Sequence, residues 1–299
     1  MKKYTSQGIK EFVSKPLFDE KIILNKDPNY PRISIVTPSY NQAQFLERTI
    51  LSVLNQNYPN LEYIIIDGDS RDGSVEIIKK YEKYLTYWVS EPDKGQSHAI
   101  KKGFEKSTGD IMAYLNSDDT YCPGTISKIV KLFTENQNVD IIYGAINLIN
   151  EKDEVLARRD MSPSKFAFSV LLFESSIPQQ ATFWKRDIYL KSGGIDPNFS
   201  FCMDLDLWVR FKLSGGKFLK VNIVSANFRS HPLSKSNTMD NIREKERLFI
   251  TEKVLGRKIG AMEWKYRYFI NKSRRYLSNP LDLFRGIIYR MMKKLRRHR

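Results

Sequence analysis

The fold is decided by the stretch PRISIVTPSYNQAQFLERTILSVLNQNYPNLEYIIIDGD, residues 31–69. Its β-branched run Ile33–Thr37 is typical of a buried strand. Apolar residues then recur at helical spacing between Phe45 and Leu54 and predict a helix with one apolar face. The run Tyr63–Ile66 predicts a second buried strand. A strand, a helix and a strand in this order form a βαβ unit, so these two strands are expected to lie parallel.

The same alternation continues along the chain. A helix is expected from Asp72 to about Tyr84, because Ser74 and its neighbours offer a capping oxygen at its start. This repetition indicates an α/β fold with a mostly parallel central sheet flanked by helices. The further strands are expected at Tyr87–Ser90, Ile111–Leu115 and Asp140–Tyr143, the further helices at Gln96–Glu105 and Pro123–Asn136, and a hairpin at Ala145–Ile149 and Val155–Arg159.

The second half of the chain is predicted to complete one domain and to end in a tail. We divide the chain into an N-terminal extension (1–30), one α/β domain (31–237) and a basic helical tail (238–299). The later elements are expected to be a helix near Ser164–Glu174, a strand at Ala181–Lys185, a helix from Asp204 to about Leu213, and a strand pair at Phe218–Val224 and Ala226–Arg229.

The positive charge is concentrated in the tail. Residues from Asp240 to Arg299 include 18 Lys and Arg but 6 Asp and Glu, whereas residues 1–239 carry 31 and 28. A body so nearly neutral argues against nucleic acid as a partner. Apolar residues make up 41% of the chain, which is enough for a core and excludes general disorder.

The cysteine content and the apolar runs limit the cellular compartments in which this protein is expected. Two cysteines, Cys122 and Cys202, are too few for a disulfide framework or a Cys-based zinc site and favour a reducing compartment. The start MKKYTSQGIKEFVSK lacks the apolar core of a signal peptide. No apolar run approaches the 18 or so residues of a spanning helix. We therefore expect a cytoplasmic protein that meets a membrane at most at its surface.

Polar segments follow three of the predicted strands where each ends. They are Thr37–Asn41, Asp67–Ser74 and Asn116–Asp119. Such residues also make ordinary turns, but all three segments fall at the carboxyl edge of the sheet, where open α/β sheets bind ligands.

The adjacent carboxylates Asp118 and Asp119 repel each other unless a cation lies beside them. Oxygen ligands favour Mg²⁺ or Mn²⁺ over zinc, and such ions bridge substrate phosphates, which suggests a nucleoside diphosphate ligand. No G-x-G-x-x-G follows the first strand, and no Lys-Ser/Thr follows Gly73. A Rossmann dehydrogenase and a P-loop protein are therefore unsupported.

Four motifs in this order resemble those of the family 2 glycosyltransferases of GT-A fold: PRISIVTPSYNQ, IIIDGDSRDGS, LNSDD and MDLDLWVR. The resemblance covers residues 31–237. Two more segments, SEPDKGQSHAIKKG (90–103) and PQQATFWKRD (178–187), resemble bacterial members that build surface polysaccharides. The resemblance implies an enzyme that moves a sugar from a nucleotide-diphosphate donor, with UDP-sugars favoured, to a growing, lipid-linked surface glycan.

The resemblance also implies a donor site with a metal ion, Mn²⁺ or Mg²⁺. The turn after the first strand would cradle the nucleotide. Asp67 is preferred to Asp69 for the nucleoside, since the family's usual second aspartate is here Gly68. Asp118 and Asp119 would bind the metal, with His231 as a possible third ligand or an exposed structural residue. The implied donor-binding residues are Thr37, Pro38, Tyr40, Asn41, Asp67, Asp69, Asp93, Lys94, Asn116 and Asp118.

Asp204 matches the family's catalytic base, although Met203 replaces the usual glutamate before it. Its alternative role is that of a helix N-terminal acid favoured by the helix dipole. One base and one metal, without a covalent nucleophile, predict inversion at the sugar. Acceptor or sugar contacts are expected from Gln179, Gln180 and Trp208.

Two other function classes remain open at this point. One is a non-catalytic nucleotide-sugar-binding protein of the same fold. The other is a nucleotidyltransferase, which would carry a Gly-rich basic loop after the first strand, where this chain has TPSYNQ.

The last twenty residues predict a basic amphipathic helix. Asn279 and Pro280 form a helix start. Apolar residues from Phe284 to Leu295 then line one face, and Lys and Arg crowd the rest. Such a helix, residues 280–299, is suited to lie on an anionic membrane surface. The alternative is a helix packed on the catalytic domain.

Overall fold

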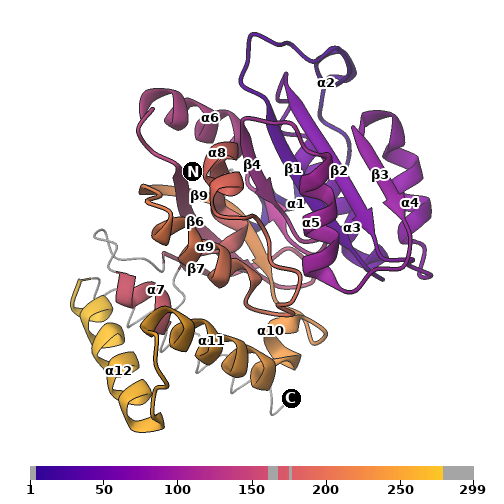
Figure 1. The fold of residues 1–299 in the computed structure, drawn as a ribbon. Coiled ribbons are helices and arrows are strands. Elements are labelled where there is room, and N and C mark those ends of the chain that lie inside the picture. The colour runs from indigo at the N-terminus through magenta and orange to yellow at the C-terminus, as the bar shows by residue number, and fades with distance from the viewer. Residues whose placement is uncertain (1–4, 161–167, 175–176, 279–299) are drawn as a thin grey trace.

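The computed structural model describes residues 5–160, 168–174 and 177–278, and it has helices on both faces of one central sheet (Figure 1). This arrangement confirms the predicted α/β class. The strands are β1 (Ile33–Ser39), β2 (Leu61–Asp67), β3 (Tyr87–Ser90), β4 (Ile111–Tyr114), β5 (Thr120–Tyr121), β6 (Ile141–Ile149), β7 (Val155–Arg159), β8 (Thr182–Lys185) and β9 (Phe218–Arg229).

The helices alternate with these strands over the first half of the chain and follow them in the second. The 3₁₀ turns are η2 (Glu82–Tyr84) and η3 (Gln179–Ala181). The α-helices are α1 (Ser6–Val13), α2 (Glu20–Asn25), α3 (Ala43–Leu54), α4 (Ser74–Tyr81), α5 (Gln96–Lys106), α6 (Thr125–Glu135), α7 (Phe168–Glu174), α8 (Arg186–Lys191), α9 (Met203–Leu213), α10 (Lys235–Thr238), α11 (Asp240–Leu255) and α12 (Ala261–Ser278).

The sheet has a parallel half and a mixed half. Its strand order is β3-β2-β1-β4-β8-β6-β9-β5, and β7 pairs with β6. The pairings among β3, β2, β1 and β4 are all parallel, as the βαβ pattern predicts. β8 runs antiparallel to both β4 and β6, and β9 runs parallel to β6. The ends of β1, β2 and β4 therefore share one edge.

Two strand predictions are corrected in the mixed half. The expected strand Asp140–Tyr143 and the first hairpin arm Ala145–Ile149 are one strand, β6, and the expected pair at 218–229 is also one strand, β9. β6 and β9 stay paired because the register shifts on both sides of Ala145. A Cβ atom at Gly144 would lie 2.6 Å from the Ile223 carbonyl oxygen, so the strands can pass this closely only at a glycine.

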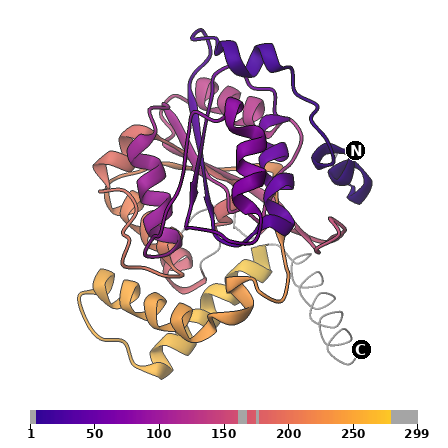
Figure 2. The ribbon, with the colours of Figure 1, turned by 90° about the vertical axis from the view of Figure 1, so that its right-hand side faces the viewer.

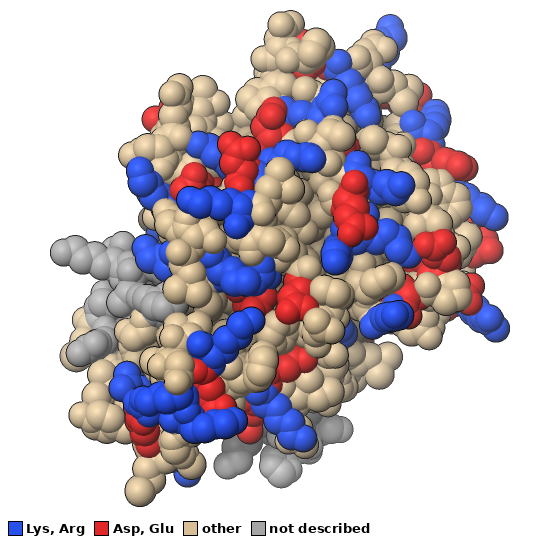
Figure 3. Space-filling view, viewed as in Figure 1, with Lys and Arg blue, Asp and Glu red and all other residues tan. Residues whose placement is uncertain are grey.

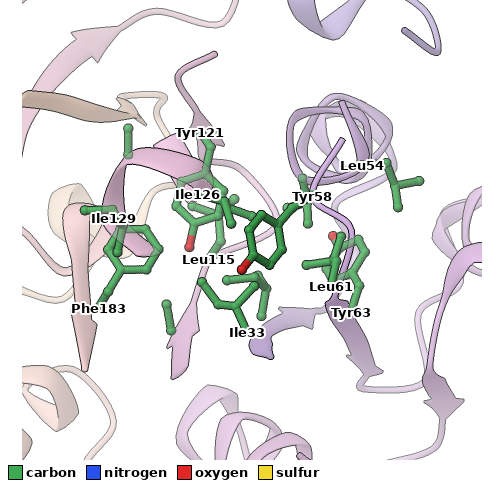
Figure 4. Close-up of a cluster of buried hydrophobic side chains, with 14 of the residues drawn as sticks. Ile33, Leu54, Tyr58, Leu61, Tyr63, Leu115, Tyr121, Ile126, Ile129 and Phe183 are labelled. Atoms are coloured by element: carbon green, nitrogen blue, oxygen red, sulfur yellow. The ribbon is translucent and has the colours of Figure 1, made fainter. Parts of the chain in front are cut away.

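Each face of the sheet carries its own apolar core. Because side chains alternate along a strand, Ile35 and Ile65 point into the core that holds α3, α4 and α6, whereas Val36 and Ile64 point into the one that holds α5 and α9. Figure 4 shows part of the first core, where Tyr121 and Phe183 stack with ring centroids 5.5 Å apart. Burial on both faces explains why runs such as YIII are apolar throughout.

The segments at both ends of the described chain pack onto this body. In the N-terminal extension, Ile9 and Val13 of α1 are buried, and the Leu17 amide donates to Asn55 at the end of α3. After residue 237, α11 and α12 contribute Ile250 and Trp264 to the second core and lie beside α7 (Figures 1 and 2). The predicted basic helix 280–299 lies outside the described residues.

The described residues carry charges of both signs on their surface. Lys and Arg are interspersed with Asp and Glu on the face seen in Figure 3. Across residues 5–160, 168–174 and 177–278, none of the helices combines the length and apolar character that a bilayer crossing requires. Cys122 and Cys202 are free and buried.

Candidate active site

A cavity of about 990 Å³ opens at the carboxyl edge of the parallel strands. Pro38 lines it from the end of β1, and Tyr40 and Asn41 line it from the loop that follows. Tyr40 is 64% exposed. The Asn41 amide donates to the Ser70 hydroxyl, so this loop is held to the loop after β2. Thr37 does not line the cavity: it is fully buried, and its hydroxyl lies 3.2 Å from that of Tyr63.

The loop after β2 differs from the expectation in which acid faces the cavity. Asp67, the preferred nucleoside ligand, is fully buried and accepts hydrogen bonds from the Ser70 amide and from the Ser70 and Ser90 hydroxyls. Its carboxylate therefore shapes the loop. Gly68 and Asp69 line the cavity in its place, and Asp69 has a positive φ of 65°.

A chain of amides crosses the cavity after β4. The Gln96 side chain donates to the Asn116 oxygen at 2.6 Å, and the Asn116 nitrogen lies 3.4 Å from the Gln179 oxygen. Gln179 in turn donates to the Tyr114 carbonyl oxygen at 2.7 Å. Both ends of the Asn116 amide are thus engaged by protein, which leaves Asp118 as the carboxylate of this segment that lines the cavity.

Asp118 is paired with a histidine from the far end of the sequence. The His231 Nε2 atom lies 3.0 Å from Asp118 Oδ2, and His231 lies two residues beyond the end of β9. The imidazole packs against the Phe45 ring, with centroids 4.9 Å apart. Of the two roles considered for His231, that of an exposed structural residue is wrong, because His231 is 6% exposed.

Asp119 lies beneath this pair and not at the cavity. It is fully buried, and its Oδ1 atom accepts from the Arg229 amide at 2.9 Å. Burial raises the pKa of Asp119 well above its usual range, and the neighbouring Asp118 charge adds to the rise. The prediction that Asp119 is a metal ligand does not agree with this position.

Arg229 is the centre of a buried network that holds the Asp118 segment. Its Nε atom donates to the Asp118 carbonyl oxygen at 2.8 Å, and its Nη2 atom lies 2.7 Å from Asp153. Asp153 also pairs with Arg48 at 2.8 Å. Arg229 is fully buried, so its hydrogen bond to the Asp118 backbone holds this segment from inside the protein.

Asp204 lines the same cavity from the first turn of α9. A helix N-terminus and the hydrogen bond from the Leu205 amide, 2.7 Å long, both favour its charged form. Burial disfavours that form more strongly and raises the pKa of Asp204 to about 6, with a smaller contribution from the Glu246 charge.

The remaining predicted residues divide between the cavity and the core. Asp93 and Gln180 line the cavity, whereas Lys94 is exposed outside it. Trp208 was expected to touch acceptor or sugar, but it is 1% exposed and packs on Trp184 with centroids 5.4 Å apart. The Trp208 side chain is not at the cavity because it packs into the second apolar core, between α9 and the sheet.

Three further residues line the cavity. Phe201 and Met203, which were not predicted as site residues, lie beside Asp204, and Lys235 lines the cavity from α10. The Lys235 ammonium donates to the Ser200 carbonyl oxygen at 3.1 Å, and burial lowers the pKa of Lys235. Their adjacency to Asp204 and His231 in sequence is the signal that could have identified them.

The glycosyl transferase family 2 model matches residues 34–206, more than half of the chain. The chain belongs to glycosyl transferase family 2. It is therefore a glycosyltransferase. An uncharacterized glycosyltransferase of Mycobacterium tuberculosis is 31% identical to it over 61% of this chain and 70% of its own length.

This family 2 glycosyltransferase shares its GT-A fold with solved structures. The mannosyltransferase PcManGT of Pyrobaculum calidifontis, solved with GDP-Man and Mn²⁺, has a TM-score of 0.59 at 19% identity and covers 95% of this chain and 80% of its own. TarS of S. aureus (residues 1–349), solved with UDP-GlcNAc, has a TM-score of 0.61 at 13% identity over 83% and 73% of the two chains.

Proposed function

We propose that this glycosyltransferase is an inverting, metal-dependent enzyme that transfers a sugar from a nucleoside-diphosphate donor to a hydroxyl group of a surface glycan. The observation that carries the proposal is a single cavity lined by both Asp118, with its partner His231, and the half-buried carboxylate of Asp204. The donors named with the structurally similar TarS and PcManGT, UDP-GlcNAc and GDP-Man, support a donor of this class.

The Asp118–His231 pair offers one carboxylate and one imidazole, which fit a divalent cation whose other ligands come from the bound donor. Within the described ranges, there is no group of three or more His, Cys, Asp or Glu side chains arranged for a metal ion. Asp118 and His231 would therefore hold Mn²⁺ or Mg²⁺ together with oxygens of the donor diphosphate. When bound, the cation offsets the charge that develops on the departing nucleoside diphosphate.

Asp204 supplies the proton acceptor. As the acceptor hydroxyl attacks the anomeric carbon, its proton passes to the Asp204 carboxylate, and the bond from that carbon to the diphosphate oxygen breaks. A single displacement of this kind inverts the configuration at the sugar. Gln96 and Gln180, which line the same cavity, offer neutral hydrogen-bonding partners for sugar hydroxyls.

A surface glycan on a lipid carrier is the acceptor class that we favour. The relative TuaG of Bacillus subtilis, 27% identical over 67% of this chain, is named provisionally for teichuronic acid biosynthesis. On α12, Met262, Tyr266 and Phe269 are exposed at helical spacing, and Lys265 lies beside them. An exposed apolar stripe with neighbouring cations supports contact with an anionic membrane, to which residues 280–299 would add.

The donor class is tested by a thermal-shift panel of UDP, GDP and their sugar derivatives in Mn²⁺. A bound ligand raises the unfolding midpoint, so at least one nucleotide should raise it for the native chain and much less for Asp118→Asn. An exposed acid elsewhere, Asp187→Asn, is the control. If no nucleotide changes the midpoint of the native chain, the proposed donor class is wrong.

A further inference from the structure

One acid from beyond the predicted catalytic domain reaches the segment that carries Asp204. Glu246 lies on α11, and its Oε1 atom accepts a hydrogen bond from the Ser200 amide at 2.7 Å. Its Oε2 atom accepts from the amides of Phe201, at 2.9 Å, and Cys202, at 2.7 Å. One carboxylate thus holds three consecutive backbone amides that lead into α9.

The start of α9 has no side-chain cap of its own. The N-cap residue of α9, Cys202, makes no side-chain capping hydrogen bond. Charge-assisted hydrogen bonds from backbone amides to a carboxylate are the strong kind, and their loss would leave amides without partners at the base of the cavity. The held segment includes Phe201 and continues into Met203 and Asp204, which all line the cavity.

Glu246 is itself fixed by the helices around it. Four residues further along α11, Ile250 is 2% exposed in the second core. The neighbouring Arg247 donates to the Leu172 carbonyl oxygen of α7 at 3.3 Å and lies over the Trp264 ring of α12. The position of the Glu246 carboxylate therefore depends on the packing of α7, α11 and α12.

We propose that Glu246 is a positioning residue of the active site, which fixes the segment that leads into Asp204 through the amides of residues 200–202. The Glu246 charge also contributes to the raised pKa of Asp204. The inference rests on the role of Asp204 in the proposed function. It also places α11 within the catalytic unit. The other titratable groups that interact with Asp204 are Tyr114 on β4 and Cys202, and Lys235 on α10 interacts with Glu246.

The test compares Glu246→Gln with Glu244→Gln, an exposed acid on the same helix, in the full chain. Two quantities are measured without any donor or acceptor. The first is amide hydrogen exchange at residues 200–202. The second is the titration of the Asp204 carboxyl carbon followed by NMR, with Asp204→Asn used to assign the signal.

In Glu246→Gln, we expect exchange at residues 200–202 to accelerate at least about tenfold, because an amide side chain cannot accept from all three N–H groups. We also expect the Asp204 midpoint to move from about 6 towards lower pH, since a nearby negative charge no longer opposes ionisation. Glu244→Gln should change neither quantity. If either quantity is unchanged in folded Glu246→Gln, the inference is overturned.

A second variant covers the case in which Glu246→Gln does not fold. Glu246→Asp keeps the charge but is one methylene shorter, so it should lose amide protection at residues 200–202 with a smaller change in the Asp204 titration. Native protection in Glu246→Asp would overturn the positioning role. Neither readout depends on sugar transfer, so a failure of the proposed function, such as full activity in Asp204→Asn, is distinguished from a failure of this inference.

Discussion

At the scale of the residue, opposing effects set the pKa of the Asp204 carboxyl group. It lies in the first turn of α9, where the helix dipole and the Leu205 amide stabilise a carboxylate. Burial and the Glu246 charge act the other way and leave its pKa at about 6. A carboxylate with this pKa is charged at neutral pH and binds a proton more readily than an exposed aspartate, which suits a general base.

Replacing Asp204 by Asn should remove this proton acceptor with little change in shape. We expect kcat/KM to fall about 10²- to 10⁴-fold, with the nucleotide-induced thermal shift retained. The measurement is steady-state transfer with the donor that the panel identifies, and Asp187→Asn is the matched control. Transfer by Asp204→Asn at the native rate would refute the assignment of the base.

The pH dependence of the reaction tests the same residue independently. Because the base works only when it is deprotonated, kcat/KM should fall below about pH 6, by about tenfold per pH unit. A profile of kcat/KM from pH 4.5 to 8 measures this, and the acidic limb should disappear in Asp204→Asn. A flat native profile across pH 6 would contradict the role.

The sequence predicts the acidic positions of the site better than it predicts their orientation. The motifs place Asp118 and Asp204 correctly at the cavity. They do not distinguish Asp118 from Asp119, and they favour Asp67 over Asp69, although Asp69 lines the cavity and Asp67 is buried. That difference is made by distant partners, such as the Arg229 amide for Asp119.

At the scale of the element, the close passage of β6 and β9 depends on Gly144. The hydrophobic pattern predicts strands on both sides of this residue but not that they are continuous. Continuity needs the register shifts with β9 and the space that a missing side chain provides. This information lies in strand pairing, which local periodicity does not contain.

Gly144→Ala should therefore destabilise the fold. Its Cβ atom would lie 2.6 Å from the Ile223 oxygen and 2.7 Å from the Ser225 hydroxyl, which predicts a loss of about 1–3 kcal/mol in the free energy of unfolding. Urea denaturation measures it. Gly260→Ala, whose Cβ would have no neighbour within 4 Å, should lose less than about 1 kcal/mol. Equal losses in the two variants would show that the close passage does not matter.

At the scale of the whole molecule, the family 2 match ends at residue 206, but the packing continues well beyond it. Ile250 and Ile259 complete the second core. His231 and Glu246, also beyond the match, contact Asp118 and the segment before Asp204. The sequence gives little indication of this, since the basic composition of residues 238–299 is typical of a detached tail.

Membrane contact is a prediction at this scale. Deleting the chain after Leu277 removes seven Lys and Arg residues, and each cation near an anionic surface contributes about 1 kcal/mol. Binding to vesicles that contain phosphatidylglycerol should therefore weaken at least about 100-fold in a sedimentation assay. Vesicles of phosphatidylcholine alone are the control. Unchanged sedimentation with anionic vesicles would mean that the deleted residues are not the anchor.

The central claim is that Asp118 and His231 hold a divalent cation that binds the diphosphate of the donor. Isothermal titration calorimetry with UDP and with GDP, each in Mn²⁺ and in excess chelator, tests it most directly. We expect at least one nucleotide to bind in Mn²⁺. Its affinity should fall at least about tenfold in chelator, and equally in Asp118→Asn with Mn²⁺ present. Equal affinity with and without the cation, in the native chain and in Asp118→Asn, would contradict the claim.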